Sequence, residues 1–196
     1  MKIDCLIPAA GFSSRMGKWK LMLPYKTSTI IENSITNALS LCSRVVLVAG
    51  YRAEELIERV KNPPKIKTCI NKNFDRGMFS SIQEGVKLIE TDWFFITMGD
   101  MPDIGIDIYK SLIYAREKEH EKFDIIRPIY HGKRGHPVLL HRKTIKTILK
   151  EPATSEMKNV FSHFKVLDIE LDIPQTFRDI NTPEEYRSIL EKGIET

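Results

Sequence analysis

Short apolar runs alternate with amphipathic stretches along the 196 residues of this chain. The apolar runs are rich in β-branched and aromatic residues, a pattern typical of buried strands of about four to eight residues. Residues 44–49 (RVVLVA) and 93–98 (WFFITM) are the clearest examples. The expected strands cover residues 3–7, 44–49, 65–70, 93–98, 123–129, 137–140 and 164–171.

The stretches between these runs predict helices. In residues 29–41, Ile31, Ile35 and Ala38 fall on one face at helical spacing. Proline directly after a capping threonine, as in Thr182-Pro183, is typical of a helix start. The expected helices cover residues 29–41, 54–61, 78–89, 104–119, 142–149 and 183–192, the second being stopped by Pro63 and Pro64.

The order of these elements predicts the fold class. Strands separated by helices at this spacing form a mostly parallel sheet with helices on both faces. The sequence contains no internal repeat, low-complexity segment or linker. We therefore predict a single α/β domain that spans residues 1–196.

Composition narrows the function classes. Hydrophobic residues make up 42% and charged residues 29% of the chain, as in ordinary soluble globular proteins. A net charge of +4 is compatible with an anionic substrate but too mild to predict a nucleic-acid partner. No apolar run approaches the roughly 18 residues that a membrane span needs, and the N-terminus lacks a secretory pattern. We expect a cytoplasmic protein with no membrane partner.

The chain has three cysteines, Cys5, Cys42 and Cys69, without C-x-x-C spacing. Cys5 and Cys69 lie within apolar runs, so we expect inert core thiols rather than disulfides or metal ligands.

One loop attracts attention for its chemistry. Residues 8–24 (PAAGFSSRMGKWKLMLP) directly follow the first expected strand. Their small residues allow close approach of the backbone to a ligand, and Arg15 and Lys20 add positive charge beside free N–H groups. This combination favours a polyphosphate site, although a plain connection with solvated cations would use the same residue types. The loop fits neither of the two commonest phosphate-loop templates.

A second loop, GDMP at residues 99–102, follows the apolar run 93–98. Ligands of open α/β sheets gather beyond the carboxyl ends of the strands, so Asp100 would lie at that edge. A carboxylate there suits Mg²⁺, which prefers one or two carboxylates with phosphate oxygens and water. Asp103 fits the role of capping the next helix better, which leaves Asp100 free.

Two oxygen-bearing side chains precede the last expected helix. In extended backbone Asp179 and Asn181 point to the same side, because the side-chain period is two. We expect them to converge on the same metal as Asp100. A plain helix start explains Thr182 and Pro183 but not these two ligands.

Two further motifs follow other expected strands. Asn71 precedes Gly77, which allows close approach at a helix start, and Ser80 and Ser81 offer hydroxyls for base or ribose recognition or, equally, for capping. Gly135-His136-Pro137 would suit an acceptor, but a lone histidine is more often structural or solvated. Lys18, Trp19 and Arg134 lie beside these motifs without a role that the sequence fixes.

Together these motifs resemble a known family. The loop 8–24 resembles the signature A-A-G-x-S-x-R-M-G-x-x-K-x-x-L-P of the MobA-like nucleotidyltransferases. RGMFSSIQEGV, GDMPD, RGHPVLL and DINTPEEY follow in the family's order and at its spacing, so the resemblance covers nearly the whole chain. It implies a Rossmann-like three-layer α/β/α sandwich of the nucleotide-diphospho-sugar transferase type. The A-A-G, GDMP and GHP motifs look most like molybdenum cofactor cytidylyltransferases and related accessory proteins of molybdenum hydroxylases.

The resemblance also implies roles for individual residues. The residues that contact the nucleotide would be Ala9, Ala10, Gly11, Arg15, Lys20, Asn71, Gly77, Ser81 and Gly99. Among them, Arg15 and Lys20 would neutralise the triphosphate and would share catalysis with Asp100. Asp100 and Asp179 would hold Mg²⁺, and the acceptor would face Gly135, His136, Pro137 and Asn181.

The implied reaction is attack by a terminal phosphate oxygen of molybdopterin, or of its molybdenum-bearing form, on the α-phosphorus of CTP. Pyrophosphate leaves, and a molybdenum hydroxylase would receive the resulting dinucleotide. Two alternatives stay open. The same fold would also serve GTP or another nucleotide with molybdopterin or a sugar or alcohol phosphate. A chaperone would bind the cofactor for a molybdenum hydroxylase without transferring a nucleotidyl group.

Overall fold

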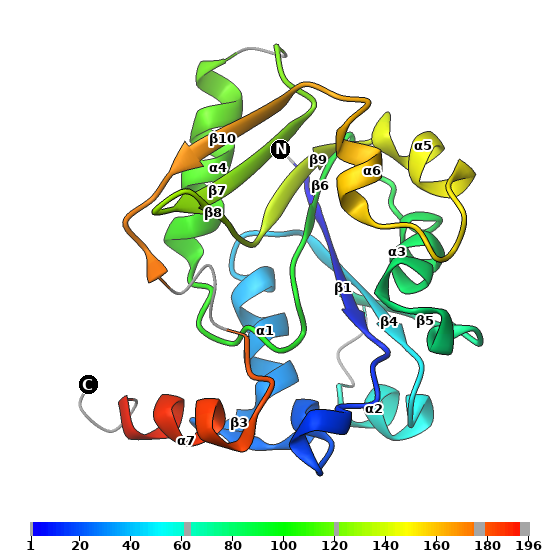
Figure 1. Ribbon diagram of the computed structural model, residues 1–196, viewed down its shortest axis with the longest axis vertical. Helices are drawn as coiled ribbons and strands as arrows, with labels where there is room; N and C mark the ends of the chain where they lie inside the picture. The colour runs from blue at the N-terminus through cyan, green and yellow to red at the C-terminus, as the bar shows by residue number, and fades with distance from the viewer. Residues whose placement is uncertain (1, 61–63, 120–121, 175–178, 193–196) are drawn as a thin grey trace.

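A twisted sheet forms the middle layer of the computed structural model, which describes residues 2–60, 64–119, 122–174 and 179–192 (Figure 1). Its strands are β1 (Asp4–Ala9), β4 (Arg44–Ala49), β5 (Ile66–Ile70), β6 (Trp93–Ile96), β7 (Ile125–Tyr130), β8 (Lys133–Arg134), β9 (Val138–His141) and β10 (Val166–Glu170). They lie in the order β10-β7-β9-β6-β1-β4-β5, with β8 paired to β7. Only β8 and β9 run antiparallel to their neighbours, so the predicted mostly parallel sheet is confirmed.

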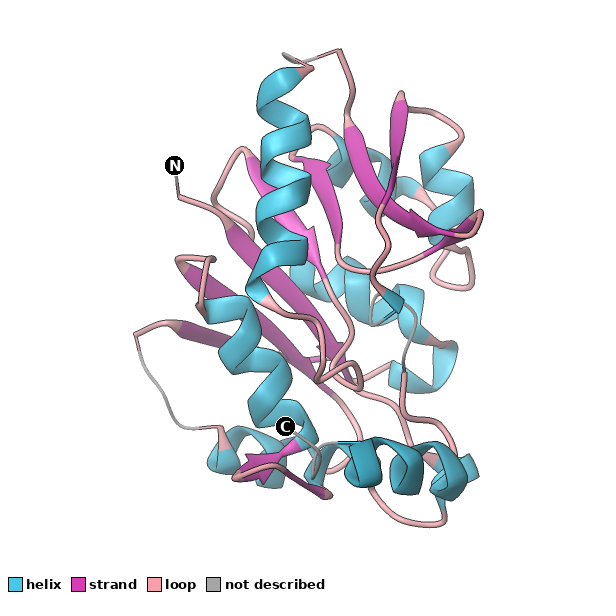
Figure 2. Ribbon diagram, turned by 90° about the vertical axis from the view of Figure 1, so that its left-hand side faces the viewer, coloured by secondary structure: helices cyan, strands magenta, loops and turns pink. Residues whose placement is uncertain are grey.

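Helices cover both faces of this sheet (Figure 2). They are α1 (Ile30–Leu39), α2 (Ala53–Arg59), α3 (Met78–Val86), α4 (Ile106–Lys118), α5 (Thr144–Lys150), α6 (Met157–Phe161) and α7 (Pro183–Lys192). Side chains of α1, α2 and α4 pack on one face, and those of α3, α5 and α6 on the other. The three-layer sandwich is therefore confirmed.

Successive side chains of β1 point to opposite faces of the sheet, so this strand contributes to the cores on both faces. Cys5 and Ile7 belong to the core beneath α1 and α4, whereas Leu6 belongs to the core beneath α3. All six residues of β1 are buried, and residues 5–9 form a continuous apolar run rather than an alternating one. The buried carboxylate of Asp4 at the start of the strand pairs with Arg44 at 2.8 Å.

Helix α1 begins where the sequence predicts. Thr29 is its N-cap, and its hydroxyl accepts a hydrogen bond from the backbone N–H of Glu32. The Glu32 carboxylate in turn accepts from the backbone N–H of Thr29 at 2.9 Å, which completes a capping box.

Several short elements differ from the prediction. Strand β8 lies between the expected strands 123–129 and 137–140 and was not predicted. Helix α6 and the hairpin of β2 (Pro24–Tyr25) and β3 (Ser28–Thr29) were not predicted either. Two-residue strands and a five-residue helix are too short to show a period in the sequence. Of the two prolines expected to stop the second helix, Pro63 lies outside the described residues, and α2 ends at Arg59.

The prediction that Asp103 caps the following helix is wrong. Gly105 is the N-cap of α4, and no side chain caps it. Asp103 instead accepts a hydrogen bond from the Tyr25 hydroxyl and lies 3.8 Å from the Lys26 ammonium. The β2–β3 hairpin, which the sequence did not reveal, supplies these partners.

Helix α7 and the segment before it pack against elements that follow β1. A separate cluster joins Ile180 and Ile189 to Met16, Tyr25 and Ile30. In Figure 1 α7 lies beside β3 and the first loop, away from the sheet. This packing fixes the segment 179–182 close to the loop that follows β1.

The three cysteines are free thiols. The prediction of a core thiol is confirmed for Cys5, which is fully buried, whereas Cys69 is only partly buried because β5 is an edge strand of the sheet. Cys42 is also buried. Burial raises the pKa of Cys5, and it raises the pKa of Cys69 to about 11. Both thiols therefore stay protonated and unreactive at neutral pH. None of the helices in the described ranges is long and apolar enough to cross a membrane.

The close packing of α3 on the sheet gives a stability prediction. A Cβ on Gly85 would lie 2.1 Å from Cδ1 of Leu6 and 2.7 Å from Cγ2 of Val48. We expect Gly85→Ala to lower the free energy of unfolding by about 1–3 kcal/mol, because overpacking outweighs alanine's better helix propensity. Urea denaturation measures this. Gly11→Ala, whose Cβ would meet nothing within 4 Å, is the control, and equal stability of the two variants would contradict the packing argument.

Candidate active site

The loop after β1 is shaped by small residues and one apolar anchor. Ser13 and Gly17 take up left-handed backbone with φ of 56° and 62°, and they flank a single 3₁₀ turn from Ser14 to Met16. Met16 is buried against α7, while Arg15 on the same turn stays exposed. The packing of Met16 therefore fixes this turn of the loop, while the Arg15 side chain stays accessible.

Three segments far apart in the sequence meet at Lys20. Its ammonium contacts the carboxylate of Asp100 and donates to Oδ1 of Asn181 at 3.0 Å. Arg15 also donates to Oδ1 of Asn181, at 2.9 Å, and the side-chain amide of Asn181 donates to the carboxylate of Asp179. The structure therefore brings together five of the eight residues predicted for catalysis, metal and acceptor contact, namely Arg15, Lys20, Asp100, Asp179 and Asn181.

A backbone hydrogen bond also joins the segment 179–182 to the loop that contains Asp100. The N–H of Ile180 donates to the carbonyl of Asp100 at 3.1 Å, and the Ile180 side chain is fully buried. Asp179 and Asn181 therefore lie together on the opposite side of the segment, as its period predicts.

Asp100 has the features of a metal ligand. The residue is only 9% exposed, and its Oδ1 is buried without a hydrogen bond to any described residue. An unpaired buried oxygen of this kind costs about 1–3 kcal/mol unless a ligand satisfies it. A hard divalent cation such as Mg²⁺ fits that oxygen, with phosphate oxygens and water completing its shell. Asp179 is exposed, and its carboxylate accepts a hydrogen bond from the side-chain amide of Asn181, which also contacts Lys20.

A cavity of about 300 Å³ opens beside this cluster. Most of the residues predicted to contact a nucleotide line it, namely Ala9, Ala10, Gly11, Lys20, Gly77, Ser81 and Gly99, together with Asp100. Arg15 and Asn71 are not among the lining residues. The sequence interpretation missed Phe12, Ser13, Phe74 and Met98 on the same walls, although Phe12 and Ser13 lie within the loop it singled out.

Asn71 is buried next to Ser81, which lines this cavity. It is 1% exposed, and its amide donates to the hydroxyls of Ser80 at 2.8 Å and Ser81 at 3.0 Å. Its Oδ1 accepts from the backbone N–H of Asn73. Asn71 thus fastens the end of β5 to the first turn of α3, and its predicted contact with the nucleotide stays a prediction.

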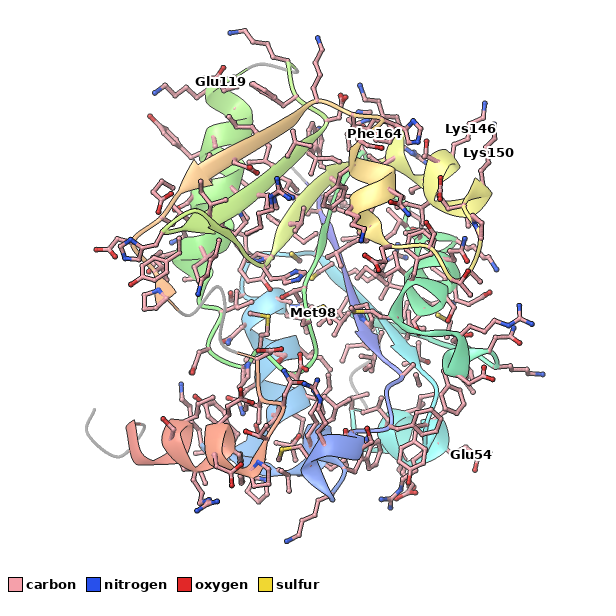
Figure 3. The ribbon with its side chains drawn as sticks, viewed as in Figure 1. Glu54, Met98, Glu119, Lys146, Lys150 and Phe164 are labelled. Carbon is pink, nitrogen blue, oxygen red and sulfur yellow. The ribbon has the colours of Figure 1, made fainter. Side chains whose placement is uncertain are left out.

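A second cavity of about 540 Å³ adjoins the first. The two share Gly77, Met78 and Met98, and Figure 3 shows Met98 near the middle of the molecule. Gly135 and His136 line the second cavity, as predicted for an acceptor site, but Pro137 is not among its lining residues. Its other walls include residues of α3 and β9, which belong to the RGMFSSIQEGV and RGHPVLL motifs, and residues of β7 and α6, which no sequence motif indicated.

His136 carries an unusual imidazole. Its Nδ1 is buried without a hydrogen bond to a described residue. Burial lowers the pKa of His136, against the opposing effects of a backbone hydrogen bond with Ile96 and the charges of Asp100 and Asp179. The ring is therefore neutral at pH 7, and its Nδ1 is a potential hydrogen-bonding group for a ligand of the second cavity.

Lys18, Trp19 and Arg134 lie in three different environments. Lys18 is exposed, whereas Trp19 is buried in the main core with the Arg52 guanidinium 4.7 Å from its ring centre. Arg134 lines the second cavity.

Comparison with known proteins decides the family. The model of the MobA-like NTP transferase domain matches residues 5–167. The chain belongs to this family of nucleotidyltransferases. It is 36% identical over 193 residues to the molybdenum cofactor cytidylyltransferase of Escherichia coli K12, covering 98% of each chain. It is 25% identical over 190 residues to a probable molybdenum cofactor guanylyltransferase of Bacillus mycoides, covering 92% of each.

A solved structure of a Methanothermobacter nucleotidyl transferase superposes on this member of the MobA-like family with a TM-score of 0.82. The two chains are 19% identical, and 99% of this chain and 98% of the other are covered. The likeness shows the fold, which agrees with the Rossmann-like type expected from the motifs.

The hydrogen bonds of Asn71 give a prediction for this wall. We expect Asn71→Ala to lower the free energy of unfolding by about 1–3 kcal/mol, because the buried partners lose their hydrogen bonds. Thermal or urea unfolding measures the change. Asn159→Ala, on exposed surface with a single hydrogen bond to Ser155, should change it by less than about 0.5 kcal/mol. Unaltered stability in Asn71→Ala would show that Asn71 does not fasten the wall.

Proposed function

We propose that this protein transfers CMP from CTP to the terminal phosphate of molybdopterin, with Mg²⁺, and releases pyrophosphate. The observation that carries the proposal is the meeting of Lys20, Asp100 and Asn181 beside the cavity lined by the loop after β1. A cation and a carboxylate at one end of a nucleotide-sized cavity suit a triphosphate and its metal ion.

The proposed metal ion would be held by Asp100, with Asp179 beside it, and would neutralise charge on the phosphates. Lys20 would release Asp100 as the nucleotide enters and would turn to the α-phosphoryl group. Arg15, exposed and bound only through Asn181 among its described contacts, would meet the departing pyrophosphate. Each of these cations acts where negative charge accumulates in the transition state.

The bond changes are simple. An oxygen of the acceptor phosphate forms a bond to the α-phosphorus, and the bond from that phosphorus to the bridging oxygen of the β-phosphate breaks. A phosphate monoester is already anionic at neutral pH, because its second pKa is about 6. Alignment and charge stabilisation are therefore enough, without a strong general base.

The second cavity supports an acceptor of substantial size. Its shared wall with the nucleotide cavity would let an acceptor phosphate reach the α-phosphorus past Met98. Gly135 and His136 would contact that acceptor from β8–β9. Asn181 lies with the cations, so we assign it to orienting Arg15 and Lys20 rather than to the distant part of the acceptor.

A difference in sequence identity and one sequence motif support CTP over GTP. The cytidylyltransferase relative is 36% identical over almost the full length, against 25% for the guanylyltransferase relative. The A-A-G motif of the first loop points in the same direction.

The direct experiment is pyrophosphate release from the purified protein with Mg²⁺, molybdopterin and each nucleoside triphosphate in turn. CTP should give the fastest release, and release should require molybdopterin. Faster release with GTP would reject the cytidylyl assignment. Binding of CTP and molybdopterin without any pyrophosphate would instead support a cofactor-binding chaperone.

Substitution of Asp100 separates catalysis from binding. We expect Asp100→Ala to lower kcat by about a hundredfold or more, because the metal loses its protein ligand while the base and ribose contacts remain. Steady-state kinetics and CTP titration measure the two effects. Unchanged turnover would remove Asp100 as the metal ligand.

Lys18, an exposed lysine of the same loop, is the control for substitution of Lys20. We expect Lys20→Ala to lower turnover by a similar factor and also to weaken CTP binding, because the triphosphate loses a cation. Lys18→Ala, which removes an exposed lysine of the same loop, should keep wild-type values. Wild-type rates in Lys20→Ala would contradict the phosphate role.

A further inference from the structure

The second cavity contains a buried arginine that none of the motifs includes. Arg127 lies on β7, is 8% exposed and lines the cavity. It donates through Nε and Nη2 to the two carboxylate oxygens of Asp168 on β10, at 2.8 and 3.0 Å. The Phe161 ring of α6 lies beneath its guanidinium, with the ring centre 5.6 Å from Cζ.

These contacts hold the guanidinium still and leave one amino group unused. The hydrogen bonds to Asp168 use Nε and Nη2 and leave Nη1 of Arg127 without a hydrogen bond to a described residue. Because Arg127 lines the cavity, a ligand there can accept a hydrogen bond from Nη1, and charged donors form the stronger hydrogen bonds. Because bidentate pairing and stacking fix the group beforehand, little conformational entropy is lost on binding.

The charge at this position narrows the ligand's chemistry. The Asp168 carboxylate offsets the positive charge of Arg127, so the pair attracts a neutral acceptor oxygen or nitrogen more than a full anion. Apolar side chains line the cavity together with Arg127, namely Phe79, Ile82, Val138, Met157 and Phe161. The cavity is also lined by the charged side chains of Arg76, Arg134, Glu156 and Lys158. A guanidinium held in place among apolar side chains suits a planar heterocycle that carries a ring carbonyl.

We propose that Arg127 determines acceptor specificity by donating a hydrogen bond to the ring carbonyl of a pterin-type heterocycle in the second cavity. This inference rests on the proposed function for the direction in which the acceptor's phosphate points. In that arrangement the ring lies among Phe161, Met157 and Ile82, and the phosphate reaches past Met98 to the nucleotide. Asp168 and Phe161 act through Arg127 as positioning residues.

The test is binding of molybdopterin, measured by anaerobic ultrafiltration without nucleotide. We expect Arg127→Met to raise the Kd by about 10- to 100-fold, the range for loss of a hydrogen bond to a charged group. Arg127→Lys should lie between Arg127→Met and wild type. Arg116→Met is the matched control, because Arg116 also lies over an aromatic ring, that of Trp93 at 5.3 Å, but lines neither cavity. An equal Kd for Arg127→Met and wild type would overturn the inference.

A second measurement distinguishes recognition from structural support. Displacement of molybdopterin by 6-hydroxymethylpterin should be about 10-fold more effective than displacement by its 2,4-diamino analogue, which lacks the ring carbonyl. Arg127→Met should lose that preference, and a merely structural role would leave it intact. Equal displacement by both compounds from the wild type, or by neither, contradicts the proposal. Where Arg127→Met folds poorly, Arg127→Met/Asp168→Asn removes both charges and is measured in the same way.

The two proposals fail differently. If molybdopterin binding depends on Arg127 but CTP yields no pyrophosphate, the role of Arg127 is supported and the transfer reaction is rejected. If pyrophosphate is released and the KM for molybdopterin is the same in Arg127→Met, the transfer reaction stands and the inference falls. Loss of CTP binding in Arg127→Met would also count against a role confined to the acceptor.

Discussion

The contact of Lys20 with Asp100 and Asn181 holds the site together. The lysine comes from the loop after β1, the aspartate from the loop after β6 and the asparagine from the segment before α7. Each is 80 or more residues from at least one of the others along the chain. Only a fold that brings these three segments to one edge of the sheet can form the contact.

The sheet and α7 provide that edge in different ways. β1 and β6 are adjacent parallel strands, so the loops that follow them meet by topology alone. The segment 179–182 reaches the same place because Ile180 and Ile189 pack on Met16, Tyr25 and Ile30. The charged cluster is therefore supported by an apolar cluster on its outer side, which limits its freedom before any ligand binds.

Much of this arrangement could be predicted from the sequence. Continuous apolar runs such as β4 and β6 gave the strands, and the parallel order placed Asp100 and the first loop at one edge. The period of extended backbone placed Asp179 beside Asn181. Local patterns were sufficient in these cases because the site lies at strand ends that the fold class already defines.

The remainder depended on contacts that no local pattern encodes. Asp103 was expected to cap α4, but the β2–β3 hairpin captured it through Tyr25 and Lys26. Arg127 on β7 pairs with Asp168 on β10, which lies 41 positions further along the chain. Helix α6 adds a further wall of the larger cavity. Such partners follow from tertiary packing rather than from residue order, so the acceptor side of the site was the less predictable half.

The two cavities therefore rest on different kinds of information. The assignment of the smaller cavity to the nucleotide is a proposal that rests on motifs, on geometry and on family membership. The assignment of the larger cavity to the acceptor is a proposal that rests mainly on Gly135, His136 and the other lining residues. A single metal ion at Asp100 would link the two, because it would lie where the phosphates of both substrates meet.

The position of that ion tests the central claim most directly. The measurement is a crystal structure with Mn²⁺ in place of Mg²⁺ and a non-hydrolysable CTP analogue, with the metal located by anomalous scattering. The account predicts a peak within about 2.2 Å of an Asp100 carboxylate oxygen, the range for such ligands, with Lys20 moved to the phosphates. A metal bound elsewhere, with Lys20 still paired to Asp100, would contradict it.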